Sequence, residues 1–585
     1  MARQLERFDN LVSLFLARAS GKGEAPFLWA KRDGGWRPVS WAEAARQVAA
    51  LAASLKRIGI EPGDRVALVS ENRPEWLIAD LAIMAAGCVT VPTYTTNTVR
   101  DHAHVLGNSG ARAVIVSNQK LAKNLVPAVL TSSECHHVIG IDEIRSGQVP
   151  DWVNVHRWAD LIAGEADVGA LTREVSRIQR GDIACIIYTS GTGGAPRGVQ
   201  LHHGSILHNL EGCTDIISTD FGWDDEVFLS FLPASHAYEH TGGQMFPIAL
   251  GAEIFYAESL EKLAANIEEV QPTIMVVVPR LFELLRARII KSIEASGGFS
   301  KYLLYRAQKI GADKYEGRLK PWDMPMDGFL SLTLRRKIRE KMGKRVKAWV
   351  SGGAPLNPEV GVFFQSLGIT FLQGYGQTEA GPLISCNRPA VGIRLETVGP
   401  PSRNTEVRIA DDGEIMVRGE NVMHGYWRNP EETERVLQGG WLATGDVGHF
   451  DEKGRIVITD RKKDLIVNDK GDNVSPQRIE GMLTLQPEIA QAMVYGDRQP
   501  HLVALLVPDP EIAGTEDLHA RLQRAVDRVN ADLSVIEKVR RFILADEAFT
   551  IENEQLTPSM KIRRHVISKV YGERLDALFR RHASA

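Results

Sequence analysis

Short apolar runs alternate with amphipathic segments from Val39 to Pro272, and this alternation constrains the fold more than any other feature. Residues 40–60, SWAEAARQVAALAASLKRIGI, carry apolar side chains at helical spacing. The runs at 64–70, DRVALVS, and 111–117, ARAVIVS, are typical of short buried strands. Helices that alternate with strands favour an α/β layer architecture with parallel strands.

Length and a later change of pattern predict more than one domain. The 585 residues are too many for one compact core. From residue 411, short apolar runs and the turn sequences DDGE, DEKG and DKGD predict a small β-rich layer. We therefore predict an α/β fold of mixed α+β character, with a large N-terminal domain of layered α/β subdomains plus this layer at 1–460. A small α+β C-terminal domain at 461–585 would follow, with its boundary at the sequence TDRKKDL.

The composition argues against several classes of protein. The formal net charge of -4 gives no global attraction to nucleic acid, so we expect no nucleic-acid partner. The five cysteines form no CxxC pair, which is typical of a reducing compartment. No run approaches the ~20 apolar residues of a membrane span. We expect a cytoplasmic protein, and we leave open peripheral contact with the inner face of a membrane and a homodimer.

A glycine-rich segment, YTSGTGGAPRGV at 188–199, follows the apolar run at 183–187. Its glycines let successive backbone amides converge on an anion, and Thr189, Ser190 and Thr192 add hydroxyl donors. Arg197 adds a planar cation suited to phosphate oxygens. The segment matches neither GxxxxGK(S/T) nor GxGxxG, so the residues alone leave two hypotheses, a phosphate cradle and a flexible surface loop.

The same segment closely resembles the signature loop of the adenylate-forming superfamily, which includes acyl-CoA synthetases, luciferases and peptide-synthetase adenylation domains. Further motifs of that superfamily follow in its order: SGGAPL at 351–356, GYGQTE at 374–379, WLATGD at 441–446, DRKKDLI at 460–466 and LTPSMKIRR at 556–564. Together they extend the resemblance over nearly the whole chain. The resemblance implies an enzyme that binds ATP with Mg²⁺.

The resemblance places the nucleotide site on these motifs. Tyr375 would offer a flat face to adenine, Thr378 a hydroxyl to phosphate, and Glu379 a carboxylate to Mg²⁺. Taken alone, Glu379 is more typical of a solvated turn. Asp446 and Arg461 would contact the ribose. The implied ATP- and AMP-binding residues are Thr189, Ser190, Gly191, Thr192, Gly193, Gly194, Arg197, Gly353, Ala354, Pro355, Gly374, Tyr375, Gly376, Thr378, Asp446 and Arg461.

Lys561 is the main catalytic residue that the resemblance implies. It would bind the carboxylate and bridging phosphate oxygens during adenylation, although composition alone indicates a solvated basic segment. His236, in FLPASHAYEH, would lie on the carboxylate side. Glu239 and His240 stay unassigned, because the HExxH spacing of a zinc site is absent there. The implied catalytic set is Lys561, Glu379, His236 and Thr189.

Three residues of the C-terminal part complete the implied site. The resemblance also implies that the C-terminal domain is mobile about a hinge near 460–463, where Lys463 would lie. Gly471 and Asn473 would approach CoA. Two positions depart from the superfamily pattern: Gly193 stands where a second threonine is usual, and Arg197 where a lysine is usual. Loss of one neutral donor costs ~0.5–1.5 kcal/mol, and arginine keeps the charge, so we expect slower turnover rather than inactivity.

The run at 439–466 and the segment VPRLFELLRARI at 278–289 resemble the long-chain fatty acyl-CoA synthetase branch. That branch implies ATP-dependent conversion of a fatty acid to acyl-AMP and then to acyl-CoA, with release of pyrophosphate and AMP. Three alternatives stay open. They are an acyl-AMP ligase that delivers to a carrier protein, a synthetase for a medium-chain or aryl acid, and a non-catalytic binder of nucleotide or acyl groups.

Overall fold

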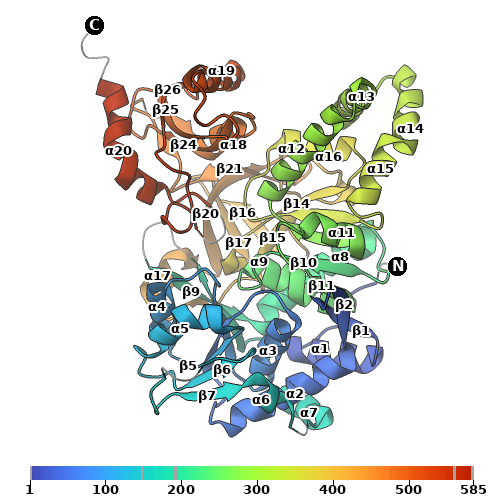
Figure 1. Ribbon diagram of the computed structural model, residues 1–585, viewed down its shortest axis with the longest axis vertical. Helices are drawn as coiled ribbons and strands as arrows, with labels where there is room; N and C mark the ends of the chain where they lie inside the picture. The colour runs from blue at the N-terminus through green and yellow to red at the C-terminus, as the bar shows by residue number, and fades with distance from the viewer. Residues whose placement is uncertain are drawn as a thin grey trace.

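The computed structural model describes residues 3–145, 149–164, 166–189, 195–470, 472–557 and 561–580. In Figure 1 the N-terminal half of the chain forms the lower body, and the orange and red C-terminal elements stand at its upper left. A pair of green and yellow-green helices rises separately at the upper right. The predicted α/β fold with a large N-terminal part and a smaller C-terminal part is confirmed.

One eight-stranded sheet has the order β18-β9-β8-β4-β3-β5-β6-β7. Its pairs from β8 to β7 are parallel, and β9 and β18 join antiparallel at one edge. The strands are β3 (Arg65–Val69), β4 (Val89–Pro92), β5 (Ala111–Val116), β6 (His137–Gly140), β7 (Asn154–Arg157), β8 (Ile183–Thr189), β9 (Arg197–His202) and β18 (Gly425–Tyr426).

The other eight-stranded sheet has the order β15-β14-β13-β12-β10-β11-β1-β2. Its inner pairs are parallel, and the edge strands β2 and β15 pair antiparallel with their neighbours. The strands are β1 (Pro26–Arg32), β2 (Gly35–Ser40), β10 (Val227–Ser230), β11 (Glu253–Tyr256), β12 (Ile274–Val277), β13 (Ala348–Ser351), β14 (Phe371–Gly376) and β15 (Leu383–Cys386).

A continuous apolar core joins the two sheets through the helices between them, and Trp41 and Trp76 are fully buried in it. Burial of one large apolar side chain contributes ~1.5–3 kcal/mol, so this core fixes the relative position of the sheets. The helices of the body are α1 (Leu11–Lys22), α2 (Trp41–Arg57), α3 (Pro74–Ala85), α4 (Val99–Ser109), α5 (Gln119–Val129), α6 (Trp158–Ile162), α7 (Val168–Val175), α8 (His203–Asp220), α9 (Ala237–Glu239), α10 (Phe246–Leu250), α11 (Leu263–Val270) and α16 (Pro358–Ser366).

Four helices between β12 and β13 form a second group, against the other side of their sheet. They are α12 (Pro279–Ala295), α13 (Gly298–Tyr315), α14 (Met324–Leu332) and α15 (Leu334–Lys341). Short turns of other helix types complete the body, namely the π-helix η1 (His240–Met245) and the 3₁₀ turns η2 (Pro321–Asp323), η3 (Thr378–Ala380) and η4 (Pro389–Val391).

The predicted β-rich layer is a five-stranded antiparallel sheet, β16-β17-β20-β19 with β21 paired to β20. DDGE connects β16 to β17 and DEKG connects β20 to β21, while DKGD lies between β22 and β23. The elements are β16 (Glu406–Ile409), β17 (Glu414–Arg418), α17 (Pro430–Val436), β19 (Leu437–Gln438), β20 (Trp441–Phe450), β21 (Ile456–Arg461), β22 (Ile466–Val467) and β23 (Asn473–Val474).

The C-terminal sheet β24-β25-β26 has an apolar core on each face. Helices α18 and α19 cover one face, and α20 covers the other. These two cores predict that the C-terminal part can hold its fold without the body. The elements are α18 (Pro476–Thr484), β24 (Ile489–Tyr495), β25 (Leu502–Pro508), α19 (Leu518–Ala531), β26 (Val539–Leu544) and α20 (Arg564–Arg580).

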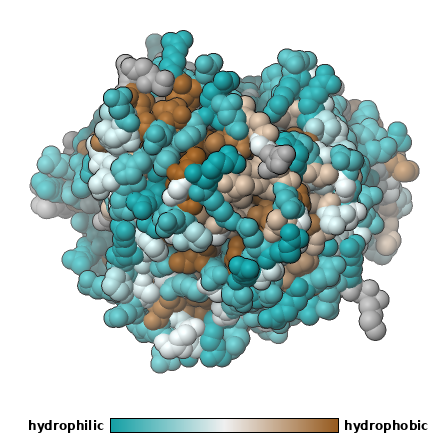
Figure 2. All heavy atoms as spheres, turned by 90° about the horizontal axis from the view of Figure 1, so that it is seen from below, coloured by the Kyte–Doolittle hydropathy of each residue, from teal (hydrophilic) through white to brown (hydrophobic). Residues whose placement is uncertain are grey.

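Figure 2 views the molecule from below, where mainly hydrophilic residues surround several separate hydrophobic patches. Scattered apolar surface of this kind is normal for a folded protein and needs no partner to explain it. Among the described residues, no helix combines the length and the apolar character that a bilayer crossing requires.

Candidate functional site

Asp446 is buried at the centre of a polar cluster, where the body meets the C-terminal part. Its Oδ2 accepts a hydrogen bond from the Tyr375 hydroxyl at 2.7 Å, and its Oδ1 accepts one from the Arg461 Nε at 2.9 Å. Strands β20 and β21 place Asp446 directly opposite Arg461, and β14 supplies Tyr375. The negative charge of Asp446 raises the pKa of Arg461. Carboxylate oxygens have further lone pairs, so Asp446 can still accept hydrogen bonds from ligand hydroxyls.

Lys561 enters the same region from the C-terminal part. Although the residue keeps exposed surface, desolvation of its ammonium and the positive charge of Arg461 lower the pKa of Lys561 to about 8. The negative charges of Asp446 and Glu379 raise this pKa and so oppose the shift. Its backbone is fixed by Thr557, because the Thr557 N–H donates to the Lys561 carbonyl at 2.8 Å. Tyr375, Asp446, Arg461 and Lys561, which come from four separate sequence motifs, thus lie in one region of the structure.

His236 lies in the N-terminal body, immediately before α9. It caps α9, where its Nδ1 accepts a hydrogen bond from the Tyr238 N–H at 3.2 Å. Desolvation, together with the positive charge of Lys561, lowers the pKa of His236 to about 4. The imidazole is therefore neutral at physiological pH. The electrostatic effect of Lys561 on His236 links the two predicted catalytic residues across the boundary between the domains.

Glu379 belongs to a chain of polar contacts that includes a residue the sequence analysis missed. The Tyr426 hydroxyl donates to its Oε1 at 2.8 Å, and the Arg197 guanidinium lies 4.5 Å from the centre of the Tyr426 ring. Arg197 also forms an ion pair with Glu432 at the start of α17. Tyr426 lies in β18, which pairs with β9, the strand that Arg197 begins. No spacing rule links these segments, so only the sheet pairing reveals the contact.

The glycine-rich segment lies at the end of the β8–β9 strand pair, where Thr189 is directly opposite Arg197. Ser190, Gly191, Thr192, Gly193 and Gly194 lie outside the described residues, as does Gly471. Asn473 pairs with Val467 in the short β22–β23 sheet. Lys463 is exposed in the turn after β21.

The predicted adenine-side loop follows β13 and is exposed at Gly353, Ala354 and Pro355. Gly353 has a φ of +81°, a conformation that glycine adopts without strain. In β14, a Cβ on Gly376 would lie 2.0 Å from the Pro382 carbonyl oxygen, so only glycine fits there. Two further predicted residues belong to the same segment: Gly374 lies in β14, and Thr378 is buried at the start of η3.

Glu239 and His240 are both buried, and their hydrogen-bond partners are not members of the Asp446 cluster. Burial raises the pKa of Glu239 to about 8, and its Oε1 accepts a hydrogen bond from the Ser230 hydroxyl at 2.6 Å. The His240 Nε2 lies 2.9 Å from the Asp80 Oδ2. In the part of the chain that the structure describes, no three His, Cys, Asp or Glu side chains form a metal-binding group.

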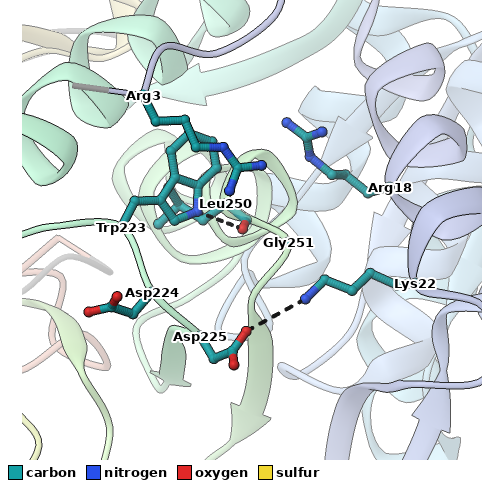
Figure 3. Close-up of a pocket in the computed structure, with 8 residues that line it drawn as sticks. All are labelled: Arg3, Arg18, Lys22, Trp223, Asp224, Asp225, Leu250 and Gly251. Atoms are coloured by element: carbon teal, nitrogen blue, oxygen red, sulfur yellow. Dashed lines mark hydrogen bonds and ion pairs between the residues drawn. The ribbon is translucent and has the colours of Figure 1, made fainter. Parts of the chain in front are cut away.

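A cavity of about 300 Å³ lies between α1 and the loop before β10 (Figure 3). The Arg3 guanidinium stacks 3.9 Å from the centre of a Trp223 ring, and the Trp223 Nε1 donates to the Leu250 carbonyl at 3.0 Å. Lys22 and Asp225 form a long ion pair of 3.9 Å at the rim. None of the predicted nucleotide-site residues lines this cavity.

Comparison with known proteins identifies the family. The model of the AMP-binding enzyme family matches residues 15–427, and that of the AMP-binding enzyme C-terminal domain matches residues 463–583. A long-chain-fatty-acid–CoA ligase of Mycobacterium tuberculosis, FadD15, is 33% identical over 583 residues, which cover 94% of this chain and 93% of that protein. A chloroplastic long-chain-fatty-acid–(acyl-carrier-protein) ligase of Arabidopsis thaliana is 29% identical over 92% of this chain and 82% of its own.

Solved structures show the same fold. The A domain of a carboxylic acid reductase from Segniliparus rugosus, in complex with AMP and a co-purified carboxylic acid, superposes with a TM-score of 0.76. It is 20% identical, and the match covers 98% of this chain and 95% of that one. The family match, the identity over nearly the whole length and the shared fold agree. The chain therefore belongs to the AMP-binding enzyme family.

Proposed function

We propose that the protein activates a long-chain fatty acid with ATP and then transfers the acyl group to CoA. The names of its relatives support the substrate class. The observation that carries the proposal is the position of Lys561, which affects His236 electrostatically and is itself affected by Arg461, Asp446 and Glu379. A cation between a carboxylate-side residue and a nucleotide site is the arrangement that adenylation needs.

The proposed roles follow from the contacts of each residue. Tyr375 would stack on adenine, and Asp446 with Arg461 would hold the ribose hydroxyls. Thr189 and Arg197 would bind the terminal phosphates together with the glycine-rich segment between them. The exposed loop at Gly353, Ala354 and Pro355 would border the adenine ring.

Glu379 fits a magnesium site of the kind that shares its ion with phosphate. Its Oε1 accepts from Tyr426, which orients the carboxylate and leaves Oε2 for a ligand. Mg²⁺ usually takes one or two carboxylates and fills its other positions with water and substrate phosphates, so a single protein carboxylate suffices. When bound, the ion would supply charge neutralisation for the leaving pyrophosphate.

In the first step, a carboxylate oxygen of the fatty acid attacks the α-phosphorus of ATP. The bond from that phosphorus to the bridging oxygen breaks, and acyl-AMP and pyrophosphate form. The Lys561 ammonium would stabilise the negative charge that develops on the reacting oxygens, and neutral His236 would border the carboxylate. In the second step, the CoA thiolate attacks the acyl carbon, the bond from that carbon to the phosphate oxygen of AMP breaks, and the acyl-CoA thioester and AMP form.

The second step would follow rotation of the C-terminal domain about the proposed hinge at residues 460–463. The separate apolar cores of that domain support a rigid-body motion, and its family model begins at residue 463. Exposed Lys463 would lie at the joint, and Gly471 and Asn473 would come to face CoA. The same rotation would withdraw Lys561.

The proposal is tested by carboxylate-dependent exchange of labelled pyrophosphate into ATP, followed by AMP release on addition of CoA. We expect exchange with fatty acids of graded length, with a preference for long chains. A purely binding protein would catalyse no exchange. A preference for medium-chain or aryl acids would replace the proposed substrate class.

A second acceptor deserves a direct test, because one relative is named as an acyl-carrier-protein ligase. CoA and a carrier protein should be offered in parallel to enzyme that has formed acyl-AMP. Formation of the CoA thioester alone supports the proposal, whereas transfer to the carrier alone supports the second function. We also propose that the enzyme acts in the cytoplasm, in contact with a membrane. We further propose that it forms a homodimer, which sedimentation velocity would test.

A further inference from the structure

An arm of the protein, residues 298–332, concentrates exposed aromatic side chains. It consists of α13, η2 and α14, which stand at the upper right of Figure 1, away from the strands. Seven Phe, Trp and Tyr side chains among the described residues count as exposed, and five of them lie on this arm. They are Phe299, Tyr302, Tyr305, Trp322 and Phe329, and they are accompanied by Met324 and Leu332.

The arm is folded firmly enough for this exposure to be a property of its surface. On the opposite side of α13, Leu304, Ala307 and Ile310 are buried in the apolar core that also contains α16. The Arg306 Nη2 lies 2.8 Å from the Asp323 Oδ1, which ties α13 to η2. The aromatic side chains therefore stay in water, although burial of each would be favourable by ~1.5–3 kcal/mol. Such a surface indicates a partner.

The charge of the surrounding segment indicates an anionic partner. Residues 279–347 contain eighteen Lys and Arg against seven Asp and Glu, a net charge of +11. The whole chain has a net charge of -4, so the rest of the chain has a net charge of -15. Protein surfaces that combine aromatic side chains with Lys and Arg bind in the interfacial region of anionic bilayers.

We propose that the arm docks on an anionic lipid bilayer, with its aromatic side chains in the headgroup region and its basic residues against lipid phosphates. This docking proposal rests on the proposed function. A long-chain fatty acid is dissolved mainly in membranes, so an enzyme that uses it would gain from contact with a bilayer. Helix α12 connects the arm to the site: it begins at Pro279, next to Val278, whose Cγ1 lies 4.0 Å from where a Gly353 Cβ would be. Docking would place the site beside the lipid that supplies its substrate.

Vesicle co-sedimentation with the full chain tests the proposal. The probes are vesicles of phosphatidylcholine alone and of equal parts phosphatidylcholine and phosphatidylglycerol. We expect binding to the anionic vesicles that weakens at high salt. The triple variant Phe299→Ser, Tyr305→Ser, Trp322→Ser should bind at least about tenfold more weakly. The matched control Trp152→Ser, Phe450→Ser removes exposed aromatic side chains elsewhere and should bind like the wild type.

Charge is tested by reversal of two exposed lysines. Each basic residue near an anionic surface contributes roughly fivefold to binding, so Lys309→Glu, Lys320→Glu, both on the arm, should lower it by at least about twenty-fivefold. Lys120→Glu, Lys123→Glu on α5 is the control and should have a much smaller effect. Equal loss in both pairs would assign the binding to net charge alone and overturn docking through the arm.

Two further outcomes decide the proposal. Unchanged vesicle binding in the folded triple variant, judged by its thermal midpoint, would overturn it. A wild-type dimer that dissociates in the triple variant would show that the arm binds a second copy, and would also overturn it. Pyrophosphate exchange with detergent-dissolved fatty acid is measured for the wild type and each variant. If none of them catalyses exchange, the proposed function is refuted, and the vesicle-binding result still decides the docking proposal.

Discussion

Replacement of Lys561 by alanine is the sharpest test of the proposed chemistry. The Lys561 ammonium is close enough to perturb His236, and Arg461, Asp446 and Glu379 perturb it in turn. One preorganised group that stabilises developing charge contributes ~10²–10³ in rate, so Lys561→Ala should slow acyl-AMP formation by that factor. Thioester formation from supplied acyl-AMP should be spared, because in the proposed mechanism that step follows withdrawal of Lys561.

The pKa of Lys561 gives the same prediction a pH dependence. With a pKa of about 8, the ammonium of the free enzyme is about nine-tenths charged at pH 7 and about one-tenth charged at pH 9. The charged form is the active one, so activity is lost as the pH rises through the pKa. We expect kcat/KM for adenylation to fall about tenfold between these values, since kcat/KM reports the free enzyme.

Two variants make the result decisive. Lys561→Arg keeps its charge over this range, so its rate, though reduced, should lack the alkaline fall. Lys569→Ala removes an exposed lysine of α20 in the same domain and should behave like the wild type. The assays are pyrophosphate exchange for the first step and thioester formation from acyl-AMP for the second. Equal loss of both steps in Lys561→Ala, or the same alkaline fall in Lys561→Arg, would refute the assignment.

Three smaller changes test other parts of the structure. Tyr426→Phe removes the hydrogen bond to Glu379 and should slow adenylation about tenfold, and an unchanged rate at all MgATP concentrations would contradict its positioning role. Burial raises the pKa of Glu239 to about 8, so the folded protein holds this proton more tightly than the unfolded chain, whose pKa is ~4.3. This contribution to the free energy of unfolding is complete below the unfolded pKa and is lost as the pH rises through 8. The thermal midpoint of the wild type should therefore fall relative to that of Glu239→Gln between about pH 5 and 8.5, and parallel curves would count against this reasoning. Gly193→Thr restores the usual hydroxyl and should raise the adenylation rate or tighten ATP binding, and no effect on either would show that the hydroxyl is not needed.

The β-rich layer shows how far local sequence predicts structure. Turn sequences such as DDGE and DEKG are local signals, and they do connect antiparallel strands. The Tyr426–Glu379 contact has no local signal, because β18 reaches it by pairing with β9. The exposure of the aromatic side chains on α13 could not be predicted from the sequence either, because helical spacing does not show which face of a helix is left uncovered.

By itself, the sequence determined the α/β fold class and the order of the motifs that contain Tyr375, Asp446, Arg461 and Lys561. These depend on short-range patterns of apolar, glycine and charged residues, which one chain displays directly. Only the tertiary structure decided that Asp446 accepts hydrogen bonds from both Tyr375 and Arg461, and that the charge of Lys561 lowers the pKa of His236. Contacts between distant segments arise from sheet pairing and domain packing, and both depend on the summed burial of many side chains rather than on any single motif.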